Sequence, residues 1–323
     1  MVKAIALFSG GLDSILAAEF VRRQKIEVLC LTFVTPFFDA KKAQKAARQI
    51  NLPLAIQDIT PEHLEMLKSP RYGYGKNMNP CIDCHTLMLK IAGKKMEETG
   101  SDFIITGEVL GQRPMSQNKQ SLYVVAKNSG YQDYILRPLS AQLLDPIKAE
   151  REILIDRSQL LSIQGRGRKD QIKLAADFGI VQYAPPAGGC LLTDPIFSRR
   201  LRDLFSHHGD RSIRDFELLK YGRHFRIGDH CKIIVGRNNA DNESLKKLAV
   251  PDDFIFNMKN FPGPLVLVPY GNNADKQVAS ALCVRYSDAP DDVKANVLCQ
   301  YNNSSETILS AAADKEDCAK WII

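Results

Sequence analysis

The fold is decided by the stretch Ala4-Ile5-Ala6-Leu7-Phe8-Ser9-Gly10-Gly11-Leu12-Asp13-Ser14, close to the first residue of the chain. Its five leading apolar residues predict a short buried strand, and the amphipathic stretch 14–23 predicts a helix directly after it. The two glycines between them let backbone amides approach an anion closely, and the helix N-terminus adds a partial positive charge. The loop holds no lysine, so it differs from the Walker P-loop, whose lysine reaches the terminal phosphates.

The alternation of apolar runs with helical stretches continues through the first part of the chain. Further strands are predicted at 27–33, 54–59, 102–106 and 135–139, and further helices at 39–50 and 87–99. This alternation indicates an α/β fold, with a parallel sheet covered by helices on both faces. Ligands bind such sheets beyond the carboxyl ends of the strands, where the glycine loop lies. Residues 61–80 are predicted to form a substrate-facing loop.

A chain of 323 residues is long enough for two domains. From about Gly222 the sequence becomes rich in β-type runs, at 231–236, 265–269 and 283–286, which predict a small α+β domain. We therefore expect a nucleotide-binding catalytic domain at 1–204, a helical linker at 205–221 and a second domain at 222–323.

Charge is distributed unevenly along the chain. Residues 1–204 hold 28 Lys and Arg against 21 Asp and Glu, whereas the remainder holds 15 against 16. The basic excess includes two clusters, formed by Arg166, Arg168 and Lys169 and by Arg199 and Arg200. Such clusters suit an RNA phosphate backbone and suit a solvated surface equally well. No signal peptide and no apolar stretch of membrane-spanning length is recognised, so we expect a cytoplasmic protein with no membrane partner.

Three of the eight cysteines have a spacing that suggests chemistry, namely Cys81-x-x-Cys84 and the distant Cys190. They could bind a 4Fe–4S cluster whose fourth iron stays open for sulfide. They could instead form a redox set, in which Cys190 bears a persulfide that Cys81 or Cys84 resolves. A zinc site completed by His85 is the third alternative. The others are predicted to be packing residues: Cys30, Cys231, Cys283, Cys299 and Cys318.

Residues 1 to about 200 resemble the PP-loop ATP pyrophosphatases, and within them the tRNA sulfurtransferases of the 4-thiouridine synthetase type. The resemblance rests on SGGLDS at 9–14, CHTLMLKIAGKKM at 84–96, TGEVLGQ at 106–112, SQ at 116–117 and ILRPL at 135–139. The sequence departs from the family at His85-Thr86, where basic residues are usual, and at Arg113-Pro114, which lengthen the segment before Gln117.

The resemblance implies a site for ATP and Mg²⁺ around the glycine loop. Asp13 would be catalytic and help to hold Mg²⁺, and Cys190 would be the catalytic cysteine that carries sulfur. Cys81 and Cys84 resemble the cluster-binding cysteines of some sulfurtransferases. The implied ATP contacts are Leu7, Phe8, Ser9, Gly10, Gly11, Leu12, Asp13, Ser14, Thr32, Phe33, Gly107 and Gln117.

The second domain resembles the RNA-binding domain of the NFACT family. The resemblance rests on VGRNNADNE at 235–243, PDDFIF at 251–256 and the Pro262-Gly263 pair. It implies that Arg237 and Lys259 contact RNA phosphates. The alternative is a structural cap whose Asn-rich turns close hairpins, since this part of the chain has no basic excess.

Together these features indicate ATP-dependent thiolation of a tRNA uridine, by adenylation of a uracil carbonyl and sulfur transfer through a 4Fe–4S cluster to form 4-thiouridine. The expected partners are tRNA, a sulfur donor (sulfide or a persulfide derived from a cysteine desulfurase) and a second copy of the chain in a homodimer. The alternatives are 2-thiouridine synthesis through a cysteine persulfide, a PP-loop amidase or ligase, and a non-enzymatic RNA-binding factor.

Overall fold

The computed structural model describes residues 1–185, 189–207, 212–270 and 275–323. The chain divides into two compact units, Met1–Thr193 and Asp194–Ile323. The first unit therefore ends before the expected domain boundary at residue 204, and the helix that follows Asp194 belongs to the second unit.

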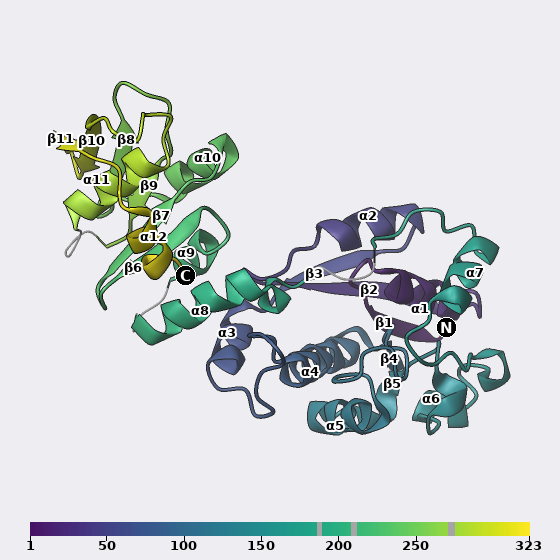
Figure 1. Ribbon diagram of the computed structural model, residues 1–323. Coiled ribbons are helices and arrows are strands. Elements are labelled where there is room, and N and C mark those ends of the chain that lie inside the picture. Colours follow the sequence, from purple (N-terminus) through teal and green to yellow (C-terminus); the bar gives the residue numbers. More distant parts are fainter. Residues whose placement is uncertain (186–188, 208–211, 271–274) are drawn as a thin grey trace. The chain divides into compact units, whose positions relative to one another are not determined.

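The first unit alternates strands and helices along the chain (Figure 1). Its strands are β1 (Lys3–Leu7), β2 (Glu27–Val34), β3 (Leu54–Asp58), β4 (Phe103–Ile105) and β5 (Ile135–Leu136). Its α-helices are α1 (Leu12–Arg22), α2 (Lys41–Gln49), α3 (Thr60–Lys68), α4 (Cys81–Thr99), α5 (Lys119–Ser129), α6 (Lys148–Arg151) and α7 (Lys169–Asp177). Short 3-10 helices lie at Gln132–Tyr134, Ala141–Leu143, Arg157–Gln159 and Leu191–Thr193.

The five strands form one parallel sheet in the order β3-β2-β1-β4-β5. The central strand β1 pairs with β2 on one side, with Leu7 opposite Leu31, and with β4 on the other, with Ala6 opposite Ile105. The predicted α/β architecture with a parallel sheet is confirmed. The central position of β1 places the loop that follows it at the middle of the sheet's carboxyl edge.

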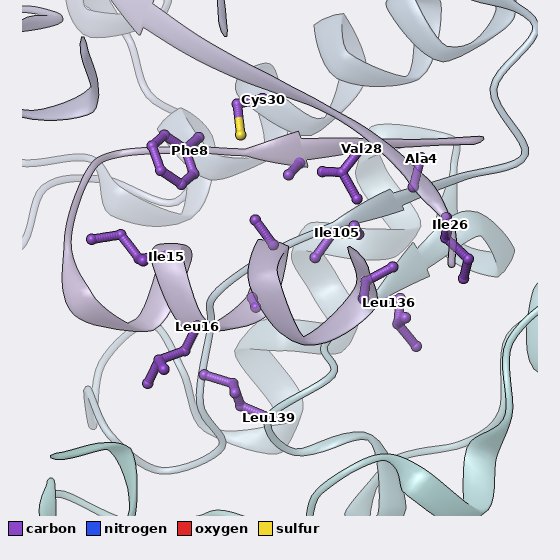
Figure 2. Packing of buried hydrophobic residues seen from close by; sticks show 14 of the residues in the cluster. Ala4, Phe8, Ile15, Leu16, Ile26, Val28, Cys30, Ile105, Leu136 and Leu139 are labelled. Atoms are coloured by element: carbon purple, nitrogen blue, oxygen red, sulfur yellow. The ribbon is translucent and has the colours of Figure 1, made fainter. Parts of the chain in front are cut away.

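Alternate residues of β1 enter two separate cores, one on each face of the sheet. Ala4 and Phe8 pack with α1, α2 and α7, whereas Ile5 packs with α4 and α5. Figure 2 shows the first core, in which Phe8 lies opposite Ile15 of α1 and Leu16 points to the other side of the helix, near Leu139. Burial on both faces explains why the strands are continuous apolar runs.

Two segments of the first unit differ from the sequence prediction. The expected loop at 61–80 begins with a helix, α3, because Thr60-Pro61 starts a turn whose residues His63 and Leu67 are buried. The predicted helix at 87–99 begins earlier, at Cys81, so that Cys81 and Cys84 lie on its first turn. The remaining part of the loop is held by Asp83, whose carboxylate accepts hydrogen bonds from the backbone amides of Arg71 and Tyr72.

The second unit is built around a six-stranded antiparallel sheet in the order β11-β10-β8-β9-β7-β6. Its strands are β6 (Arg223–Ile227), β7 (Cys231–Val235), β8 (Phe254–Met258), β9 (Val266–Val268), β10 (Ala295–Tyr301) and β11 (Ser304–Ser310). Its helices are α8 (Pro195–His207), α9 (Ile213–Leu218), α10 (Asn239–Leu248), α11 (Lys276–Arg285) and α12 (Lys315–Trp321). The predicted α+β character of this part is confirmed.

One strand prediction in the second unit is wrong. Residues 283–286 end helix α11, which Asp275 caps by accepting a hydrogen bond from the amide of Val278. A short apolar run cannot distinguish a buried strand from a buried helix. The packing prediction for the remaining cysteines is confirmed, since Cys30, Cys231, Cys283, Cys299 and Cys318 are buried free thiols.

In the described part of the chain, no helix combines the length and apolar character that crossing a membrane requires.

The junction between β1 and α1 requires glycine at position 10. Gly10 has a φ of +73°, and a Cβ atom there would lie 2.4 Å from the backbone carbonyl of Lys42. The start of α2 therefore lies directly against the glycine loop. Both the dihedral angle and the lack of space exclude a side chain at this position.

We expect Gly10→Ala to lower the free energy of unfolding of the first unit by at least about 2 kcal/mol, because it adds a backbone clash to an unfavourable φ. Gly130→Ala is the matched control, with a φ of +83° and no atom within 4 Å of the added Cβ. The control should cost only about 1 kcal/mol. Urea unfolding followed by hydrogen exchange in α1 measures both, and equal losses would contradict the explanation.

Candidate functional site

The glycine loop presents free backbone amides at the start of α1. No side chain in the described part of the chain caps the first turn of this helix, which begins after Gly11. The Ser9 hydroxyl accepts a hydrogen bond from the Gly11 amide at 3.3 Å, and the Ser14 hydroxyl donates to the Gly11 carbonyl at 2.8 Å. The side chains thus fix the loop conformation, and the first-turn amides are left for an anion.

The expected ATP contacts from other segments lie at the same edge of the sheet. The Phe8 amide donates to the Leu31 carbonyl at 2.8 Å, which places the end of β1 beside Thr32 and Phe33. Gly107, which follows β4, approaches the backbone of the loop as closely as Gly10 approaches the backbone of α2. A Cβ atom on Gly107 would lie 2.5 Å from the amide nitrogen of Ser14. The structure therefore brings residues 7–14, 32, 33 and 107 together.

Asp13 is a half-buried carboxylate, one of whose oxygens is buried without a hydrogen-bond partner among the described residues. Its Oδ2 accepts a hydrogen bond from Gln112 Nε2 at 3.1 Å, while its Oδ1 has no partner among the described residues. Burial raises the pKa of Asp13, against the opposing effects of the Gln112 hydrogen bond and the nearby Arg168 and Arg113. An unpaired carboxylate oxygen is the ligand type that Mg²⁺ prefers, so this residue fits the metal that the family resemblance implies.

Two residues that contact this region were not predicted to do so. Gln112 ends the TGEVLGQ motif, and its contact with Asp13 could have been proposed from that motif. Arg168 was predicted to bind RNA, but its charge acts on Asp13, and its Nε is buried without a partner among the described residues. Gln117, a predicted ATP contact, likewise has a buried Oε1 that no described residue satisfies. Unsatisfied buried polar atoms in a native site call for a ligand or water.

The three cysteines meet in the first unit. Cys81 and Cys84 lie three positions apart on α4, and the two residues therefore face the same side of the helix. Electrostatic interactions connect the three thiols, since Cys190 and Cys81 both act on Cys84, and Cys81 acts on Cys190. The segment after Cys190 is held by the Leu191 amide, which donates to the Phe37 carbonyl at 3.0 Å.

Two observations relate the segment that holds Cys190 to the glycine loop, one a backbone pairing and the other an electrostatic effect. The backbone of Ala184, which precedes Cys190, pairs with Gly11 in a parallel bridge. The charge of Arg113 acts on both Asp13 and Cys190. The thiols and the loop therefore belong to one region of the first unit.

Burial makes two of these thiols weak acids. The pKa of Cys190 rises to about 11, mainly through burial and partly offset by hydrogen bonds from the amides of Leu192 and Thr193 and by Arg113. The pKa of Cys84 also lies well above its usual range, because its sulfur is enclosed and the other two thiols add repulsion. Both groups are protonated at neutral pH, so their chemistry requires a proton acceptor.

His63 lies beside Cys84 as a hydrogen-bond partner, not as a strong base. Its Nε2 lies 3.6 Å from Cys84 Sγ, and its ring lies 5.4 Å from Phe37 and 5.5 Å from Phe38 between ring centres. The side chain is fully buried, and burial lowers its pKa to about 4, so the ring is neutral at neutral pH. The sequence held no signal for this residue, because a single histidine in an amphipathic helix is most often a packing residue.

The three thiols are the donor type that an iron–sulfur cluster takes. In the described residues, however, no group of three or more His, Cys, Asp or Glu side chains is arranged to hold a metal ion. As they are placed, Cys81, Cys84 and Cys190 do not fit a cluster or a zinc ion without moving. His85, the proposed fourth zinc ligand, instead contacts Glu108 through Nδ1 at 2.9 Å.

Glu108 is the central residue of a buried polar cluster in the first unit. Its carboxylate contacts His85 and accepts a hydrogen bond from Arg137 Nε at 3.0 Å and another from the Thr106 hydroxyl at 3.1 Å. Burial alone would raise the pKa of Glu108, but Arg137 and His85 lower it to about 2. The TGEVLGQ motif thus fixes the position of His85, next to Cys84.

The predicted RNA contacts occupy different environments. Arg166, Lys169 and Arg199 are exposed, as an RNA contact requires. Arg200 is different, because it is buried and donates to the carbonyls of Leu219 and Gly222 at 2.8 Å each. Its prediction as an RNA contact is not supported, since its guanidinium stabilises the second unit from inside. In that unit, Arg237 forms an ion pair with Asp241 at 2.6 Å, and Lys259 donates to the Thr307 hydroxyl at 3.3 Å.

Two families of known proteins match this chain. Residues 1–149 match the family described as thiamine biosynthesis protein (ThiI), and residues 222–322 match the family described as NFACT protein RNA binding domain. The two matches lie in separate parts of the chain and do not overlap. The ThiI match contains the glycine loop, Cys81 and Cys84.

Similar proteins include two named probable tRNA sulfurtransferase. The protein of Thermoanaerobacter sp. (strain X514) is 30% identical over 171 residues, which cover 50% of this chain and 40% of that protein. The protein of Thermococcus kodakarensis is 28% identical over 142 residues, which cover 42% and 36%. The chain thus spans about two fifths of the length of these relatives.

A solved 4-thiouridine synthetase–RNA complex with bound ATP has 21% sequence identity to the chain and a TM-score of 0.37. It covers 55% of this chain and 52% of that one, and a likeness of this size carries no argument about chemistry.

We expect Asp13→Asn to abolish tight binding of Mg²⁺–ATP while making the free protein more stable at neutral pH. Because the pKa of Asp13 is raised on folding, its charged form costs stability at every pH above that pKa, and the cost disappears below the unfolded value. The uncharged asparagine side chain removes this cost, and its oxygen can still accept the hydrogen bond from Gln112. Urea unfolding at several pH values and nucleotide titration measure the two effects. A variant that is less stable at pH 7, or that binds nucleotide normally, contradicts the assignment.

Proposed function

We propose that this protein is an ATP-dependent tRNA sulfurtransferase that converts a uridine into 4-thiouridine. The observation that carries the proposal is the convergence of three thiols with an anion-binding glycine loop in one region of the first unit, connected through Arg113. The relatives' name, tRNA sulfurtransferase, supports the same reaction class. The reaction would take place in the cytoplasm.

The first step activates the base. The uracil carbonyl oxygen attacks the α-phosphate of ATP, a P–O bond forms, and pyrophosphate leaves. The first-turn amides of α1 and the guanidinium of Arg168 stabilise the negative charge on the phosphates. Asp13 Oδ1 would hold Mg²⁺, which when bound neutralises phosphate charge. Thr32, Phe33, Gly107 and the end of β1 would border the nucleoside.

The second step transfers sulfur. A persulfide donor loads Cys190, and the terminal sulfur then bonds to the activated uracil carbon as the C–O bond breaks and AMP leaves. Cys81 or Cys84 next attacks Cys190 Sγ, the S–S bond breaks, thiouridine is released, and a disulfide remains for a dithiol reductant. The attacking thiol would lose its proton to solvent, because His63, whose pKa burial lowers to about 4, is too weak a base to hold it; His63 Nε2, 3.6 Å from Cys84 Sγ, would orient that thiol.

A 4Fe–4S cluster is the other form of this proposal. Cys81, Cys84 and Cys190 would be its ligands, and it would supply a bound sulfide at its open iron. The three thiols would have to move closer together to bind it. Iron and acid-labile sulfide analysis of anaerobically purified protein distinguishes the two forms.

The second unit would hold the tRNA. Its NFACT family supports this role, and Arg237 and Lys259 are the side chains we propose as phosphate contacts. We retain the division into a catalytic domain at 1–204, a linker at 205–221 and an RNA-binding domain at 222–323. Arg166, Lys169 and Arg199 are exposed cations that suit the same substrate. A homodimer remains part of the proposal.

The test compares thionucleosides in tRNA from cells with and without the gene. Loss of 4-thiouridine is expected, whereas loss of 2-thiouridine would assign the neighbouring reaction. An unchanged nucleoside profile, with no ATP-to-AMP turnover stimulated by tRNA, would favour a non-enzymatic RNA-binding factor. A PP-loop amidase or ligase predicts full activity after all three cysteines are replaced by alanine.

We expect Cys190→Ser to reduce thiouridine formation at least about 100-fold while tRNA-dependent exchange of pyrophosphate into ATP stays within about threefold of the wild type. The reason is that adenylation needs the loop, whereas sulfur transfer needs the thiol. Cys318→Ala, a buried cysteine of the second unit, is the control and should retain both activities. Loss of exchange together with thiolation would show that Cys190 supports the nucleotide site instead.

A further inference from the structure

Helix α2 has a charge arrangement that is unfavourable for the helix itself. Its sequence, KKAQKAARQ, holds four cations and no acidic residue, and Lys41 and Lys42 stand in the first turn. Cations at a helix N-terminus oppose the helix dipole, and like charges four positions apart, as in Lys41 and Lys45, repel each other. The buried alanines of the helix explain its packing, but they do not explain this charge.

The exposed face of α2 borders a groove of about 440 Å³. The residues that line it share a polar or cationic character and include no acid; they are Lys41, Gln44, Lys45, Arg48, Gln49 and Gln182. Among the described residues, Lys41 pairs with Asp39 at 3.8 Å, and Lys45 and Arg48 have no ion pair. Lys45 and Arg48 therefore give the groove a positive charge that no described acid neutralises, which suits an anion.

The groove adjoins the nucleotide loop on two sides. The backbone of Lys42 lies against Gly10, as the 2.4 Å approach of a Cβ there shows. The Gln49 amide, in the orientation that its neighbours favour, bonds the backbone of Gln182 at 2.7 Å and 3.3 Å. Two residues later, Ala184 pairs with Gly11. A ligand in the groove thus lies beside the loop where we propose that the base is activated.

We propose that this groove binds the phosphate backbone of the RNA substrate, with Lys45 and Arg48 as the main contacts. The inference rests on the proposed function and names a substrate surface in the catalytic unit. The helix rises about 10 Å from Lys41 to Arg48, which is longer than one phosphate group and suits consecutive phosphates of a polynucleotide. The amides of Gln44 and Gln182 add hydrogen-bond donors to phosphate oxygens.

The test uses the full chain with Lys45→Ala/Arg48→Ala and, as the matched control, Lys90→Ala/Lys94→Ala. The control pair consists of exposed cations four positions apart on α4, in the same unit. Fluorescence anisotropy with a tRNA transcript between 50 and 200 mM KCl should show about tenfold weaker binding for the α2 variant. The slope of log affinity against log salt should become smaller by about 1 to 2. The control should bind like the wild type.

Three other outcomes overturn the inference, and a fourth overturns the proposed function alone. Equal tRNA affinity of both variants would show that the groove binds no RNA, and competition by polyglutamate without an effect of the α2 variant on tRNA would assign an acidic protein instead. Weakened binding of a fluorescent ATP analogue would make the groove part of the nucleotide site. If wild-type protein shows no thiolation but the α2 variant still loses tRNA, the proposed function fails while this surface stands.

Discussion

The structure depends on the close approach of three backbone segments around the first turn of α1. Gly10 lies against the start of α2, and Gly107 lies against the backbone of Asp13 and Ser14, in both cases without space for a Cβ atom. These contacts hold the ends of β1 and β4 and the start of α2 at one point. The first-turn amides of α1 are thereby directed to the carboxyl edge of the sheet, where an anion can bind.

Several polar atoms around this point lack a hydrogen-bond partner. Asp13 Oδ1, Gln117 Oε1 and Arg168 Nε are buried without partners among the described residues, which is costly unless a ligand satisfies them. The thiols of Cys84 and Cys190 are kept protonated by burial, and a neutral His63 lies beside Cys84. In the proposed function, a bound nucleotide would satisfy these polar atoms, and a separate donor would load sulfur onto the thiols.

The sequence pattern predicted those elements whose conformation depends on residues close together in the chain. The strand, glycine loop and helix at 4–23 follow from periodicity and from the positions of glycine, and the parallel sheet follows from alternation. The spacing of Cys81-x-x-Cys84 predicted that these two thiols lie together. Cys190 is distant in the sequence, and it was added because the expected sulfur chemistry needs a third thiol. Contacts made by tertiary packing had no local signal, which is why His63 was missed and the buried Arg200 was taken for a surface cation. The helix end at 283–286 was mistaken for a strand because Cys283, Val284 and Tyr286, with Arg285 among them, are too few to show a helical period.

The most direct measurement of the central claim is a crystal structure of the protein with Mg²⁺ and a non-hydrolysable ATP analogue. The account predicts that the phosphates lie on the amides of residues 10–14, that the metal binds Asp13 Oδ1, and that Cys190 Sγ faces the α-phosphate with no packed side chain between them. A nucleotide bound elsewhere, or a Cys190 thiol separated from the α-phosphate by the protein interior, would contradict it.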